Sequence, residues 1–64
     1  MELSQAEIDR YAPYHTFPEF ELGFDAYVAG LVPAFDIPGV AGQAYDRGGE
    51  CAMRRQMTEL RKQA

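Results

Sequence analysis

Two side chains of this 64-residue sequence could act as a base or a nucleophile, His15 and Cys51, and each type occurs once. Such groups work only when a partner activates them and a third group orients that partner. No activating or orienting group is evident around His15, and Cys51 lies among small residues, where cysteine behaves as a small apolar side chain. A lone cysteine excludes an intrachain disulfide, and a lone histidine argues against a zinc site. We therefore expect no catalytic residue, no metal site and no cofactor.

The carboxylates are better candidates for a function, and that function is binding. The net charge of −4 hides an asymmetry, because residues 1–46 carry eight acids and one base (−7), whereas residues 47–64 carry five bases and two acids (+3). Acids spread over helices and a loop can resemble the phosphates of a nucleic acid and attract a basic groove. Alternatively, they form the solvated surface of a soluble domain. The predicted partner-binding residues are Glu19, Glu21, Asp25, Asp36 and Asp46.

Aromatic residues between positions 11 and 20 would supply the contact area that charge alone does not. We predict that they are exposed beside the acids. The five basic side chains near the C-terminus are typical of a helix end that complements the helix dipole, although they could also contact RNA. They are Arg47, Arg54, Arg55, Arg61 and Lys62.

Local signals predict two short helices before residue 31. Ser4 is a suitable N-cap, and Glu7 three residues later completes a capping box. Pro13 should end this first helix after about two turns. Pro18 is suited to the start of the second helix, which should end near Gly30. Five apolar residues fall on one face of this second helix at a helical spacing, namely Phe20, Phe24, Tyr27, Val28 and Leu31.

A third helix is predicted from about Val40 to Lys62, after a loop whose Phe35 and Ile37 fold back onto the core. Its weak point is the pair Gly48-Gly49, because each helical glycine costs about 1 kcal/mol relative to alanine. The pair either kinks the helix or allows another helix to approach closely. The predicted buried stripe consists of Ala41, Ala44, Tyr45, Gly48, Ala52, Met53, Met57 and Leu60.

These elements predict one all-α domain over residues 1–64, a short N-terminal helix followed by a two-helix hairpin. A chain of this length buries only about 60 % of its unfolded surface and has no room for a deep catalytic cleft. No apolar run is long enough for a membrane span or a signal-peptide core, so we expect a cytoplasmic protein. The small-residue ridge Ala44, Gly48, Ala52 could also pack against a second copy and form a homodimer.

The segments AYVAGL at 26–31 and AYDRGGECAMRR at 44–55 resemble the ribosome modulation factor family of small two-helix proteins. That family has a similar aromatic-x-Ala-Gly turn on its first helix and an aromatic-x-x-Gly-x-x-x-Ala-Met pattern on its second. The resemblance covers about half of the chain and implies a helical hairpin that binds ribosomal RNA. The matching positions are Tyr27, Ala29, Gly30, Tyr45, Gly48, Ala52 and Met53.

In size and acidity the chain is also similar to phage-encoded anti-CRISPR proteins and DNA mimics. Our leading hypothesis is a non-enzymatic inhibitor from a phage or mobile element that blocks a basic, nucleic-acid-binding surface of a host protein or nucleoprotein complex. Direct nucleic-acid binding is not expected in that case, because the acidic half repels phosphate. The alternative is a ribosome-modulation-factor-like protein that binds ribosomal RNA through its basic C-terminal helix.

Overall fold

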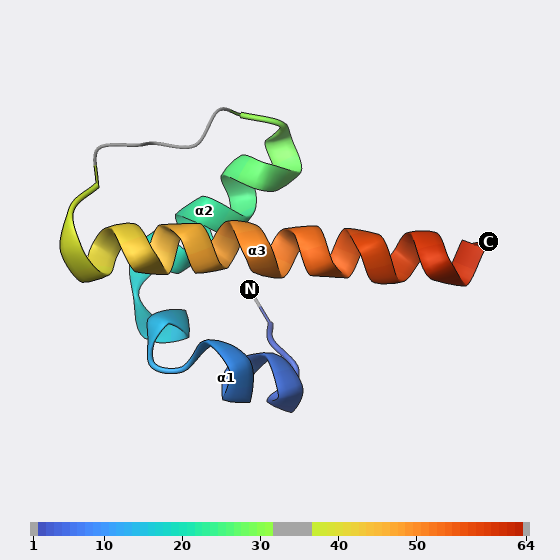
Figure 1. Cartoon of the computed structure of the whole chain (residues 1–64), viewed down its shortest axis with the longest axis horizontal. Helices are drawn as coiled ribbons and strands as arrows, with labels where there is room; N and C mark the ends of the chain where they lie inside the picture. Colours follow the sequence, from blue (N-terminus) through green and yellow to red (C-terminus); the bar gives the residue numbers. More distant parts are fainter. Residues whose placement is uncertain (1, 32–36, 64) are drawn as a thin grey trace.

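The computed structural model describes residues 2–31 and 37–63, which form three α-helices and a short 3-10 turn and contain no strand (Figure 1). The helix α3 is a long rod, α2 packs against its N-terminal and central turns, and α1 meets its middle through Tyr11 and Glu7. The predicted all-α class is confirmed. The elements are α1 (Gln5–Tyr11), η1 (Tyr14–Thr16), α2 (Pro18–Ala29) and α3 (Gly39–Gln63).

The helix boundaries follow the local signals. The Ser4 hydroxyl accepts the Glu7 backbone N–H at 3.2 Å, and the Glu7 carboxylate accepts the Ser4 N–H at 2.9 Å, so the capping box is confirmed. The backbone of Ala12 is extended (ψ 142°), as expected before a proline. Pro18 occupies the first turn of α2, and Gly30 ends that helix in the left-handed conformation (φ 72°).

The helices α2 and α3 touch backbone to backbone through a pair of glycines. A Cβ atom on Gly48 would overlap the Phe20 carbonyl, and a Cβ atom on Gly23 would overlap the Tyr45 carbonyl. The helix α3 continues straight through Gly48-Gly49 (Figure 1), so of the two predicted alternatives, a kink or a close approach, the structure has the close approach. The approaching helix is α2 of the same chain. Since α2 buries Gly48 and its neighbours Ala44 and Ala52, this ridge is not available to a second copy.

The core is small and aromatic. Tyr11 and Phe20 are almost completely buried, with 5.5 Å between their ring centroids, and they pack with Ala44 and Cys51. The prediction that the aromatic residues at 11–20 form an exposed contact surface is therefore wrong for these two residues. The chain turns between α1 and α2 and brings both rings against α3, where burial of each contributes about 2 kcal/mol or more.

The predicted buried stripes are wrong at their C-terminal ends. Val28 and Leu31 are 69 % and 64 % exposed, and Met57 and Leu60 are 48 % and 58 % exposed. For Met57 and Leu60 the reason is length: α2 stops at Gly30, so neither it nor the seven-residue α1 covers the last turns of α3, which project beyond the bundle (Figure 1). Val28 and Leu31 are exposed because the C-terminal end of α2 is angled away from α3 (Figure 1). Met53, also predicted to be buried, is 38 % exposed.

Within the described ranges, no helix is both long enough and apolar enough to cross a membrane. The helix α3 has the length, but charged residues occur in every part of its C-terminal half. Of the predicted loop residues, Ile37 is half-buried, whereas Phe35 lies outside the described residues.

Arg55 joins α1 to α3 through hydrogen bonds. The Arg55 guanidinium donates to both Glu7 carboxylate oxygens at 2.7 and 2.8 Å, and also to the Glu2 carbonyl at 2.7 Å. Its planar group also lies over the Phe24 ring, 5.1 Å from the centroid. Hydrogen bonding to Arg55 is the main cause that lowers the Glu7 pKa to about 2. Arg55 therefore has a structural role that its position in a basic tail did not indicate.

Candidate partner-binding groove

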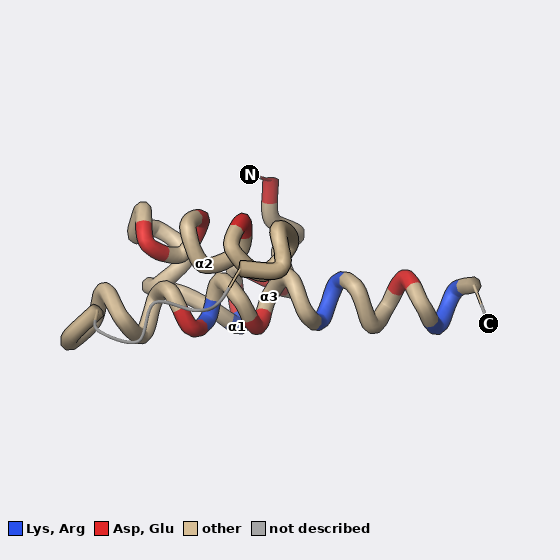
Figure 2. The backbone as a smooth tube through the Cα atoms, turned by 90° about the horizontal axis from the view of Figure 1, so that it is seen from above, with Lys and Arg blue, Asp and Glu red and all other residues tan. Residues whose placement is uncertain are grey.

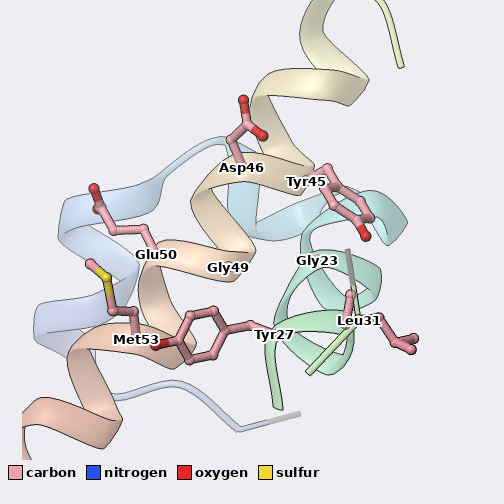
Figure 3. Close-up of a pocket in the computed structure, with 9 residues that line it drawn as sticks. Gly23, Tyr27, Leu31, Tyr45, Asp46, Gly49, Glu50 and Met53 are labelled. Carbon is pink, nitrogen blue, oxygen red and sulfur yellow. The ribbon is translucent and has the colours of Figure 1, made fainter. Parts of the chain in front are cut away.

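An apolar groove of about 330 Å³ runs between α2 and α3, next to the point where the two backbones touch (Figure 3). Its floor is formed by glycines, because a missing side chain leaves a depression. Gly23 is required for helix contact, but a Cβ atom on Gly49 would meet only the Gly23 carbonyl at 3.8 Å. Gly49 is thus not needed for packing, and its small size keeps the groove open. The lining residues are Gly23, Ala26, Tyr27, Leu31, Tyr45, Asp46, Gly49, Glu50 and Met53.

One end of the groove is built by Tyr27 and Met53. The Tyr27 hydroxyl donates to the Gln56 side-chain oxygen at 3.0 Å, a hydrogen bond between α2 and α3 that holds the ring in place. Figure 3 shows the ring lying toward Met53, while Tyr45 stands at the other end. Tyr27 remains 40 % exposed and Met53 38 % exposed, so both side chains offer apolar surface to a bound molecule.

The rim on the α3 side is negatively charged. Asp46 and Glu50 are one helical turn apart and both line the groove. Asp46 makes no ion pair or hydrogen bond with the residues that the structure describes. Glu50 lies 3.5 Å from Arg54, but this pair is exposed and on one helix, so it contributes little and can be exchanged for another cation. An apolar pocket beside two carboxylates suits a hydrophobic group with a positive charge next to it.

The four predicted acids that the structure describes are not brought together by the fold. Asp46 lines the groove, whereas Glu21 and Asp25, four residues apart, share an exposed side of α2 outside it. Glu19 is half-buried in the first turn of α2, and Asp36 lies outside the described residues. Figure 2 shows the acids of α2 separated from those on the rod of α3.

Sequence reasoning missed Glu50 as part of the site. Its spacing of four residues from Asp46 on a predicted helix was an available signal, since residues at i and i+4 lie on the same face. The groove itself had no signal in the sequence, because it depends on how α2 and α3 cross.

Four of the five C-terminal basic residues have contacts within the chain, and in two of these, Arg54 and Lys62, the contact is an exposed ion pair on α3 itself. Arg47 lies over the Tyr14 ring, 4.2 Å from the centroid, and Arg55 holds α1. Lys62 is 4.0 Å from Glu59 in an exposed pair. Arg54 and Arg61 are exposed on the C-terminal half of α3, where Figure 2 shows most of the positive charge.

The two residues with potential reactivity lie away from this groove. Cys51 is 1 % exposed, and its thiol donates to the Glu7 carboxylate at 3.4 Å. Burial, together with Glu7, raises the pKa of the thiol to about 11. The Nδ1 atom of His15 is buried and has no hydrogen-bond partner among the described residues.

We predict that native Cys51 resists alkylation. A pKa raised from 9 to about 11 reduces the thiolate fraction at neutral pH by about 100-fold, and burial slows access further. Labelling with a thiol reagent at pH 8, in buffer and in denaturant, measures this ratio. Equal rates in the two conditions would show that the side chain is accessible and the core is open.

Comparisons with protein-family models, with curated proteins and with solved structures found no match for this chain.

Proposed function

We propose that this protein is a small, non-enzymatic binding protein whose groove between α2 and α3 receives an apolar side chain of a partner protein. A basic group beside that side chain would pair with Asp46 and Glu50. The observation that carries the proposal is the combination of an open apolar groove with a carboxylate rim in a chain of net charge −4.

The free energy of burying one partner side chain in the groove is large enough to anchor an interface there. Burial of one large aliphatic or aromatic side chain contributes about 1.5–3 kcal/mol, and aromatic walls such as Tyr27 and Tyr45 are common at the centre of protein interfaces. A standard interface of about 800 Å² per partner would cover about a sixth of the accessible surface of 4620 Å². The groove is an anchoring point within such an interface.

Charge outside the groove supports a basic partner. Glu21 and Asp25 on the exposed side of α2 add to the negative field that attracts a positively charged surface and speeds association. A partner of this kind could be a host protein or nucleoprotein complex whose nucleic-acid-binding surface is blocked. This is the function of an inhibitor from a phage or mobile element, of the anti-CRISPR or DNA-mimic kind.

The test compares the proteins that bind to tagged wild type with those that bind to variants of the groove. We expect tagged wild-type protein to retain a set of basic proteins that Asp46→Arg loses, with affinity for the purified partner reduced at least about tenfold, because a buried charge pair becomes a repulsion. Asp9→Arg makes the same charge change on α1, outside the groove, and should reduce affinity by less than about twofold.

A second variant distinguishes binding in the groove from long-range electrostatic attraction by acids outside it. Glu21→Lys with Asp25→Lys should slow association and reduce the salt dependence of binding while leaving dissociation nearly unchanged. Equal partner binding by wild type and Asp46→Arg would refute the groove as the site.

A second candidate is RNA binding of the kind that the ribosome modulation factor resemblance implies. The supporting observation is that Arg54, Arg61 and Lys62 are exposed on the projecting end of α3. The close contact of α2 and α3 through small residues is also consistent with that resemblance. Co-sedimentation with ribosomes that decreases steeply as salt rises would support this candidate, and its absence at low salt would exclude it.

A further inference from the structure

The projecting end of α3 has the same chemistry that the groove requires of a partner. Met57 and Leu60 are 48 % and 58 % exposed and lie three residues apart on one side of the helix. Arg61 follows directly, is exposed, and makes no ion pair with the residues that the structure describes. The chain thus carries both an apolar groove with an acidic rim and an apolar segment with a basic neighbour.

A single copy cannot bring these two features together. Asp46 at the groove and Arg61 at the projecting end lie on the same uninterrupted helix. Fifteen residues at 1.5 Å per residue place them about 22 Å apart along the helix axis. The groove of one copy is therefore open to the projecting end of another copy, but not to its own.

We propose that two copies associate with their α3 helices antiparallel, each placing Met57 and Leu60 in the other's groove and Arg61 beside the other's Asp46. A two-fold axis makes the arrangement self-complementary, because the contact formed in one direction is repeated in the other. A parallel arrangement would instead set Arg61 against Arg61 and Asp46 against Asp46. Charge complementarity therefore selects the antiparallel pair.

This proposal rests on the proposed function, because it assigns a regulator to the same groove. In the dimer both grooves are filled, so a partner protein binds only to the dissociated chain. When about nine-tenths of the protein is dimeric, the apparent affinity for the partner falls about tenfold, since affinity scales with the fraction of the competent form.

Sedimentation equilibrium from about 5 to about 500 µM tests the dimer, a range suited to micromolar association. We expect wild type to change from monomer to dimer within this range. Leu60→Ser should stay monomeric and keep its helical circular dichroism, because Leu60 is exposed in the single chain. Lys62→Gln, a charge change on the same turn outside the predicted contact, should dimerise as wild type does.

A charge exchange tests the orientation of the two copies. Asp46→Arg and Arg61→Asp should each weaken dimerisation at least about tenfold, and the double variant should restore it, because the ion pair is re-formed with opposite polarity. A monomeric wild type at the highest concentration, or a double variant that is no better than the single ones, would overturn the dimer.

Partner binding by Leu60→Ser distinguishes the two proposals. If Leu60→Ser binds the partner more tightly than wild type does, dimer and partner use the same groove. If wild type is shown to dimerise and the two proteins bind the partner equally well, the dimer does not regulate partner binding. Loss of the groove-dependent partner interaction from Leu60→Ser itself would show that the projecting end binds the partner, which contradicts self-occlusion. If the double variant restores dimerisation but Asp46→Arg weakens the binding of no partner protein, the proposed function is refuted and the dimer is not.

Discussion

Gly48→Ala is expected to destabilise the protein by about 2 kcal/mol or more, although alanine is the better helix former by about 1 kcal/mol. The new methyl group would overlap the Phe20 carbonyl and lie 3.0 Å from the Phe24 backbone nitrogen, so α2 and α3 must move apart. Separation loosens the packing of the small core. Since a chain of this size has a total stability of only about 3–5 kcal/mol, this loss removes about half of it.

The adjacent glycine offers a matched control. Gly49→Ala places the same methyl group one residue away, where the nearest atom is the Gly23 carbonyl oxygen at 3.8 Å. We therefore expect it to stabilise the helix by about 1 kcal/mol. Thermal unfolding followed by circular dichroism would show opposite shifts in Tm for the two variants. A Gly48→Ala protein as stable as wild type would disprove the backbone contact on which the fold depends.

Acidification is expected to detach α1, with a loss of about 2 kcal/mol of stability between pH 4.5 and pH 2. The Glu7 pKa is 4.5 in the unfolded chain and about 2 in the folded one, mainly because Arg55 donates to its carboxylate. The lowered pKa stabilises the fold fully above pH 4.5, and this contribution is lost as the pH falls toward 2. Denaturant unfolding at pH 7, 4.5, 3 and 2 measures the loss.

Variants of the ion pair show whether this pH dependence belongs to Glu7. Glu7→Gln and Arg55→Gln should each lower the stability at pH 7 by about 1–2 kcal/mol and should flatten the profile between pH 4.5 and pH 2. Arg61→Gln removes a positive charge from an exposed position and should leave the profile nearly unchanged. A profile of Glu7→Gln that is as steep as that of wild type would assign the pH dependence to other carboxylates.

Much of the helical framework is predictable from residues close together in the sequence. A cap forms between Ser4 and Glu7, and Pro18 and Gly30 mark the ends of α2 through restrictions on their own backbones. These effects operate within about one helical turn. The all-α class and the burial of Ala44, Gly48 and Ala52 were predicted for the same reason, since small residues at helical spacing mark the face of a helix that can be packed closely.

The candidate site was only partly predictable. Asp46 was selected for its charge, and the structure places it on the groove, but Glu21 and Asp25 have the same charge and lie elsewhere. Charge alone does not tell which side of a helix meets another element. The periodicity of α3 likewise grouped Met57 and Leu60 with the buried stripe, because periodicity identifies a face and not the length over which it is covered.

The sequence by itself determined where the helices begin and end, that their contact uses small residues, and that the acidic and basic residues occupy different parts of the chain. Only the tertiary structure decided which apolar residues are covered and which charges are paired. Arg55 contacts Glu7 across 48 positions, and the groove joins residues of α2 to residues of α3. Such contacts depend on the relative lengths and crossing of the helices, which no interaction within a single helical turn specifies.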